Sequence, residues 1–432
     1  MVGHRPGREA RPAGDSGQAG PGGASSFPAG APRGHLVDSD LRLSRSLGFW
    51  HYVAINVGAI VGAGWLLAPL GAAVYDGPLS VVSWIIASVL VLFMALAYAY
   101  LAYFMPRTGA VVRYPQATHG DLVGFTAGTL YLLSIASLMP AEAVAIVYYA
   151  SYYVPGLVQK GVALGQTVLV LTPKGMLLAL AVVAMIFVIN YFGVRLVGNV
   201  SLGLLVWKLG VPALVVGALL ALAFSPRNLQ LSGVTQASQL NLGAAAAVLS
   251  AIPVTGIMYS LLGFRQAVEY GGEGRSSSRD VPRAVVVSVI ISAVLFVLLE
   301  VAFIGGIRWS ETHPVRTLPN GTTIVLSNVS LTPGNWTALS TSNIAAAPLA
   351  SELALVGLGA LSVLMIIDAW VSPLGNAIIQ MGNLARIVYG MAANGHLPRS
   401  LRSLNRYAVP GVGLVVALAL GVAFMLPFPS WY

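Results

Sequence analysis

The segment GAIVGAGW, residues 58–65, interrupts an apolar run that extends from about residue 49 to residue 75. Its three glycines weaken a helix by up to about 1 kcal/mol each relative to alanine. In a lipid bilayer, a break in a helix is tolerated only where the backbone is buried in protein or lines a cavity. The segment therefore predicts an interrupted membrane-spanning helix, with close packing of helices against the glycines as the alternative interpretation.

The composition places this run in an integral membrane protein. Of the 432 residues, 57% are hydrophobic and 9% are charged, whereas soluble domains contain about 25% charged residues. About 20 apolar residues of helix cross the hydrocarbon core, and backbone groups in lipid must be satisfied within the segment. We therefore predict an all-α polytopic fold with nine spans, at about 49–75, 79–104, 122–153, 175–192, 200–224, 245–270, 284–307, 349–378 and 411–427.

A second interruption is expected in the sixth span. The segment YSLLGFR, residues 259–265, contains a glycine and leads into a charged stretch. Interrupted helices at corresponding positions of two halves indicate a transporter site between inverted repeats. Free amides at the start of a half-helix bind a carboxylate, and free carbonyls at the end of one bind a cation. A zwitterion would satisfy both groups, with its carboxylate on the amides and its cationic group on the carbonyls.

The remaining composition excludes several classes of function. The chain has no cysteine, so disulfides and thiolate metal sites are excluded. Its histidines are scattered, which argues against an enzyme, and nothing points to a cofactor. The formal charge of +9 comes from dispersed basic residues and predicts no nucleic-acid partner. Residues 1–48 are rich in Pro, Gly, Ala and Ser, and they predict a disordered tail.

Basic residues predict the orientation. With the tail in the cytoplasm, sixteen Lys and Arg fall inside and five outside, which follows the positive-inside rule and predicts a plasma-membrane protein with a cytoplasmic N-terminus. The long loop at about 308–348 would lie outside. It contains glycosylation sequons at Asn320, Asn328 and Asn335, whose use stays open. Nine spans also leave residues 427–432 outside, and the chain looks cut off there.

From about Leu47 onward, the chain resembles the amino acid–polyamine–organocation permeases of prokaryotes. The resemblance rests on four stretches in order: residues 58–65, the Gly263-Phe264 pair, its charged continuation at 269–283, and the segment at 386–398, which is similar to the family's loop before span nine. It implies a five-plus-five inverted-repeat fold. It also implies that the substrate α-carboxylate binds the amides around Gly62, Ala63 and Gly64. The α-amino group would meet carbonyls near Tyr259, Ser260 and Leu261, in the segment that contains Gly263.

The chain departs from the family pattern in three respects. Family members usually have twelve spans and need ten for the core, so the end of the second repeat would be missing. Arg265 follows the Gly-Phe pair where many members carry a glutamate. Glu142 in span three and Asp368 in span eight are acids that many amino acid permeases lack.

Lys208 lies eight residues into the predicted fifth span, about 12 Å of helical rise from its cytoplasmic end. Removal from water favours the neutral amine, which would let it bind and release a proton near neutral pH. In some proton-coupled family members, such a lysine takes the place of a coupling sodium ion beside the broken first helix. The resemblance thus implies proton coupling through Lys208. Snorkelling to the membrane surface or pairing with an acid are the alternatives.

Three acids also lie within predicted spans, namely Glu142, Glu300 and Asp368. Each could relay protons, contact substrate or pair with Arg265, because a buried charge needs a partner. Arg265 could instead receive a side-chain carboxylate, which would favour acidic substrates.

The sequence as a whole predicts secondary active transport of amino acids by alternating access, with a proton as the coupling ion. The alternatives are sodium coupling, amino acid exchange, or a non-transporting amino acid sensor with the same fold.

Overall fold

The apolar runs form helices in the part of the chain that this computed structural model describes, which comprises residues 40–151, 153–163, 166–317 and 323–426. Within it, six helices are long and apolar enough to cross a membrane, or seven if one bent pair counts as a span. Two shorter apolar helices, Phe49–Ile60 and Gly411–Met425, correspond to the start of the first predicted span and to the ninth. The predicted tail up to residue 39, Asn320 and residues 427–432 lie outside the described residues.

The first predicted span is broken where the glycines predicted it. Helix α2 (Phe49–Ile60) ends before Gly62, a 3-10 turn η2 follows at Gly64–Leu66, and α3 (Ala68–Asp76) continues the chain. The second half then leads through the 3-10 turn η3 (Gly77–Leu79) into α4 (Ser80–Phe104). The sequence predicted two separate spans, at about 49–75 and 79–104. In the structure, Ala68–Phe104 forms one continuous apolar helical segment, because only the 3-10 turn η3 separates α3 from α4.

The sixth predicted span is bent by 57° between α10 (Ala244–Val254) and the segment Ile257–Glu269. That segment consists of α11 (Ile257–Leu261), the 3-10 turn η5 (Leu262–Arg265) and α12 (Gln266–Glu269). The sequence placed the interruption at 259–265. The structure places the bend earlier, because Gly256 takes a φ of 81°, a left-handed conformation that glycine adopts without steric cost.

The other helices are α5 (Ala110–His119), α6 (Asp121–Ala150), α7 (Pro173–Tyr191), α8 (Val194–Leu222), α9 (Gln236–Gln239), α13 (Ser277–Gly306), α14 (Pro348–Leu355), α15 (Gly359–Ala393) and α16 (Gly411–Met425). The remaining 3-10 turns are η1 (Asp40–Arg42), η4 (Pro226–Gln230), η6 (Gly271–Glu273), η7 (Trp336–Thr341) and η8 (Arg399–Arg402).

Two short antiparallel hairpins were not expected in an all-α fold. They pair β1 (Val158–Ala163) with β2 (Gln166–Leu171) and β3 (Val315–Thr317) with β4 (Thr323–Val325). Both lie in loops between spans.

Helix α15 is longer than predicted. The sequence ended the eighth span near residue 378 and took residues 386–398 as a loop, but α15 continues to Ala393. Within this helix, Arg386 is buried and its charge is paired with that of Glu273. Arg386 is one of the sixteen basic residues that the predicted topology places inside, and only 1% of its side chain is exposed.

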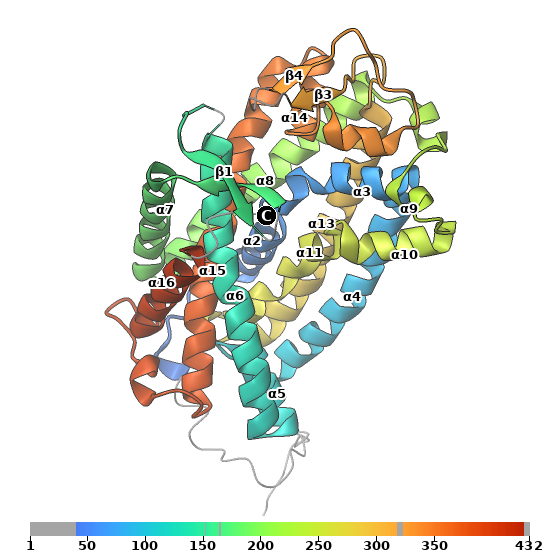
Figure 1. Cartoon of the computed structure of the whole chain (residues 1–432). Coiled ribbons are helices and arrows are strands. Elements are labelled where there is room, and N and C mark those ends of the chain that lie inside the picture. The colour runs from blue at the N-terminus through green and yellow to red at the C-terminus, as the bar shows by residue number, and fades with distance from the viewer. Residues whose placement is uncertain (1–39, 152, 164–165, 318–322, 427–432) are drawn as a thin grey trace, which may run out of the picture.

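Helix α2 lies at the centre of the bundle, where it contacts α8, α13 and α15 as well as the turn η5. Around it, α4 packs along α13 and α6 packs along α15. Figure 1 shows the hairpin β3–β4 at one end of the molecule and α5 at the other. Helix α2, which ends at the break, therefore packs against three long helices in the interior of the bundle.

Candidate substrate and coupling site

The Lys208 side chain lies at the broken end of α2. It is fully buried on α8, and its Nζ donates hydrogen bonds to the backbone carbonyls of Gly58 at 2.7 Å and Val61 at 2.6 Å. A third bond goes to the carbonyl of Ser372 on α15 at 2.8 Å. The three donors of an ammonium thus meet three acceptors. The side chain points into the bundle and not toward a helix end.

The break in α2 supplies two of these acceptors. Inside a helix, the carbonyl of Gly58 would accept from the amide of Gly62, four residues on. That amide instead donates to the carbonyl of Ile60 at 3.1 Å, which leaves Gly58 for the lysine. Lys208 is therefore held by backbone carbonyls that the break in α2 leaves available, while Asp368 and Glu142 interact with it electrostatically.

The broken segment approaches polar side chains closely. A Cβ atom on Gly62 would lie 2.5 Å from Asn376 Nδ2 and 2.8 Å from Glu142 Oε1, so a larger residue would displace these two side chains. Asn376 Nδ2 donates to Glu142 Oε1 at 2.8 Å, and the backbone amide of Ala63 interacts with the same carboxyl group. The amides that the sequence assigned to a substrate carboxylate thus lie beside a protein carboxyl group.

The second predicted half of the site faces the first. A Cβ atom on Gly64 would lie 3.5 Å from Ser260 Oγ and 4.0 Å from Tyr259 Cδ1. Tyr259 is 57% exposed, whereas Ser260 and Leu261 are buried. The bend lies before this segment, so the Tyr259 carbonyl accepts from the amide of Leu262.

Gly263 is placed differently from its predicted neighbours. A Cβ atom there would collide with the backbone of Ala59 and Ile60, so the two interrupted spans touch at this glycine. Gly263 therefore lies at a packing contact between the two helices.

Asp368 lies near the lysine but is held by neutral donors. Trp207 Nε1 donates to its Oδ1 at 2.8 Å, and Ser372 Oγ donates to Oδ1 at 2.9 Å. Glu300 lies elsewhere, on α13, where it accepts from Ser80 Oγ and Trp84 Nε1.

Arg265 does not join these acids. Its guanidinium lies 4.6 Å from the centre of the Tyr131 ring. Among the described residues, no ion pair links it to Glu142, Glu300 or Asp368, so the pairing considered from the sequence does not occur.

Sequence reasoning missed the polar face of α15. Ser372, Asn376 and Gln380 follow Asp368 at intervals of four residues, which places all four on one face of the helix. Gln380 Nε2 donates to Asn376 Oδ1 at 3.0 Å, and Gln266 Nε2 donates to Gln380 Oε1 at 3.2 Å. This spacing of polar residues within an apolar run was visible in the sequence.

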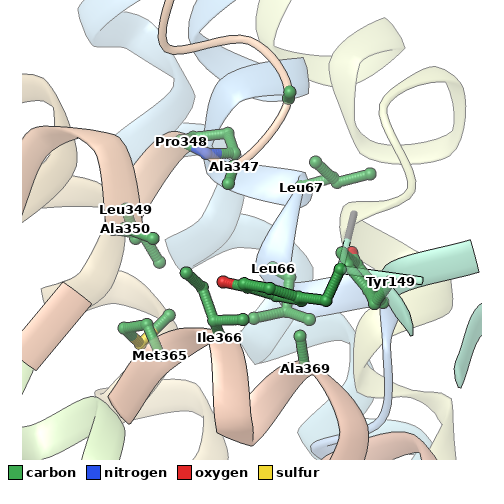
Figure 2. A pocket seen from close by; sticks show the side chains of 12 residues that line it. Leu66, Leu67, Tyr149, Ala347, Pro348, Leu349, Ala350, Met365, Ile366 and Ala369 are labelled. Atoms are coloured by element: carbon green, nitrogen blue, oxygen red, sulfur yellow. The ribbon is translucent and has the colours of Figure 1, made fainter. Parts of the chain in front are cut away.

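A cavity of about 90 Å³ lies directly beyond the broken segment. It begins at Leu66 and Leu67 and extends between the loop before α14 and the side of α15. Figure 2 shows Leu66, Met365 and Ile366 around it, and its lining is almost entirely apolar. The predicted binding glycines lie beside this cavity along the chain, but they do not line it.

Two buried ion pairs join the elements at the α5 end. Glu273 forms a bidentate pair with Arg386, with oxygen–nitrogen distances of 2.5 and 2.8 Å, and the guanidinium also stacks on Tyr270. Asp40 forms a second bidentate pair with Arg113, with both distances at 3.1 Å. These pairs connect η6 with α15 and η1 with α5, so they close this end of the bundle.

Comparison with known proteins identifies the family. Residues 47–429 match the family model described as amino acid permease. The chain is 31% identical to the aspartate–proton symporter of Bacillus subtilis, over 90% of this chain and 68% of the relative. It is 29% identical to the glutamate/serine transporter AimA of the same organism, over 90% and 67%. It is 21% identical to the branched-chain amino acid permease BcaP of Lactococcus lactis, over 90% and 78%. These relatives are transporters and not enzymes, and the chain belongs to the amino acid permease family.

Proposed function

We propose that this protein is a proton-coupled amino acid symporter that works by alternating access at the break of α2. The observation that carries the proposal is the contact of Lys208 with three backbone carbonyls of α2 and α15. Carbonyls that converge in this way suit a cation, and here a protonatable cation is part of the protein. Membership in the amino acid permease family supports amino acids as substrates.

The proton would control how α2 is held. A protonated Lys208 offers three donors to three carbonyls, whereas the neutral amine offers two donors and a lone pair that faces an acceptor. Hydrogen bonds from a charged donor contribute about 1.5–3 kcal/mol each. Loss of the proton therefore weakens the link between α2, α8 and α15, and would allow the broken helix to move.

The substrate would bind where the two interrupted spans face each other. Its α-carboxylate would take the amides of Gly62, Ala63 and Gly64, and its α-amino group the segment Tyr259–Leu261. Since the amide of Ala63 interacts with Glu142, this acid would have to yield to a substrate carboxylate. Acidic amino acids are the first substrates to test, because two of the relatives are named for aspartate and glutamate transport.

The arrangement of helices supports an inverted repeat. The second predicted span, α4, packs along the seventh, α13, and the third, α6, packs along the eighth, α15. Spans five positions apart are equivalent in a five-plus-five repeat, so each of these pairs joins equivalent helices. The basic residues favour an N-terminus in the cytoplasm of a plasma-membrane protein, which would place the hairpin β3–β4 outside.

The test is uptake of radiolabelled aspartate, glutamate, serine and leucine into liposomes without sodium. Native protein, Lys208→Ala and the matched control Lys174→Ala would be compared with and without an inward proton gradient. Lys174 is exposed near the start of α7, so its removal changes the same charge far from α2. We expect uptake driven by the gradient in the native protein and the control, and uptake indifferent to it in Lys208→Ala.

Each part of the proposal can fail separately. Uptake by native protein that ignores the proton gradient, or that requires sodium, would refute proton coupling and leave amino acid transport standing. Binding of an amino acid without uptake under any gradient would favour a sensor.

A further inference from the structure

A polar cavity of about 300 Å³ opens at the α5 end of the bundle, away from the substrate site. Three chain segments form it: the turn at Asp40 and Arg45 before α2, the loop at 106–107 after α4, and the glycine-rich segment that leads into α13. It is at the small end of the range for ligand pockets. The proposed transport mechanism does not use it.

The charge of this cavity is positive. Arg45, Arg107 and Arg275 line it, and among the described residues the one acid in its wall is Asp40. Both carboxylate oxygens of Asp40 accept from the Arg113 guanidinium at 3.1 Å, so its charge is already compensated. Arg45 and Arg275 are exposed, and the field in the cavity therefore favours an anion.

Hydrogen-bond donors face the same space. Residues 276–278 are three consecutive serines that line the cavity, and α13 begins among them. The side chain of its N-cap residue, Ser276, makes no capping hydrogen bond. The 30-residue helix thus directs its first backbone amides and the positive end of its dipole toward the cavity.

Glycines bring the backbone close to this space. Gly271, Gly272 and Gly274 line the cavity directly before the serines. A Cβ atom on Gly272 would lie 2.5 Å from Thr108 Oγ1, so a larger residue would disturb the wall. A glycine-rich loop that leads into a helix N-terminus, with arginines around it, is an arrangement that binds phosphate groups.

We propose that this cavity, formed by Arg45, Arg107, Arg275 and the N-terminus of α13, binds a phosphate group. The ligand is either the headgroup of an anionic phospholipid or a soluble phosphate. A phosphate fits better than a carboxylate because its oxygens can meet arginines on one side and amides and serine hydroxyls on the other. Because η6 belongs to one wall of the cavity and carries Glu273, an occupied site would hold the closed end of the bundle together.

The experiment measures binding to the full chain in nanodiscs of phosphatidylcholine, without amino acid and at about 150 mM chloride, where exposed charges are screened beyond about 8 Å. One arm titrates inorganic phosphate by calorimetry. The other counts bound phosphatidylglycerol by native mass spectrometry, with phosphatidylcholine as the reference lipid. Because neither arm involves transport, the result does not depend on the proposed function.

The variant is Arg45→Ala with Arg275→Ala, and the matched control is Arg399→Ala with Arg402→Ala, which removes the same charge outside the cavity. We expect the cavity variant to weaken binding about tenfold or more, and the control to bind as the native protein does. Unchanged thermal unfolding of both would show that they are folded.

The two arms distinguish the ligand. Variant-sensitive binding of phosphatidylglycerol but not of phosphate would identify a lipid headgroup, and the reverse would identify a soluble phosphate. Both results support the site. Absence of binding in both arms, or equal binding by the cavity variant and the native protein, would overturn the proposal.

Discussion

The buried pair between Glu273 and Arg386 allows a quantitative prediction. Both side chains are at most 1% exposed, and the guanidinium is further held by the carbonyl of Gly382 at 2.8 Å. Glu273→Gln keeps the shape of the side chain but leaves Arg386 charged and without its counter-ion. Removing one partner of a buried ion pair costs about 3–5 kcal/mol. We expect the closed arrangement at the α5 end to lose that much relative to an open one.

The assay uses the absence of cysteine from the chain. Thr108→Cys introduces one thiol at a fully buried position that pairs with the backbone of Tyr270. A water-soluble maleimide can reach this thiol only when the segment around Tyr270 moves away. Since 1.4 kcal/mol corresponds to a factor of ten, Glu273→Gln should raise the labelling rate by about a hundredfold to several thousandfold.

The control is Glu311→Gln, which breaks the ion pair with Arg308 between side chains that are 37% and 44% exposed. Such a pair contributes about 0.2–1 kcal/mol, so the labelling rate at Thr108→Cys should stay nearly unchanged. If Glu273→Gln raised the rate no more than this control does, the buried pair would not hold the end closed, and the reasoning from burial would be refuted.

The remaining predictions concern stability, measured as the thermal unfolding midpoint in detergent. Gly263→Ala places a methyl group against the backbone of Ala59 and should destabilise the fold by at least about 1–3 kcal/mol, whereas Gly203→Ala, which meets open space, should not lower the midpoint. Equal midpoints would show that the interrupted spans do not touch there. Asn228→Asp replaces the Nδ2 that donates to three carbonyls at the end of α13 and should cost about 1–3 kcal/mol. The exposed Asn241→Asp should leave the midpoint unchanged, and an equal loss in both variants would contradict the capping role.

Sequence and structure agree most closely where the information is local. The helices follow the apolar runs, because in lipid a segment must satisfy its own backbone. The first break lies at residues 61–67 because glycines weaken a helix wherever they occur in number. The second break lies earlier than predicted. Gly263, on which the prediction relied, is a packing contact between helices, whereas the chain turns at Gly256.

The sequence by itself determined the membrane class, the family and the identity of Lys208 as a residue to examine. Only the tertiary structure decided what these residues contact. Lys208 meets Gly58 across 150 residues of chain, and Glu273 meets Arg386 across 113. The extended end of α15 contains one partner of that ion pair. Local propensity acts over a few residues, whereas such contacts depend on how all the helices pack. The packing of the helices cannot be read from the periodicity of the sequence.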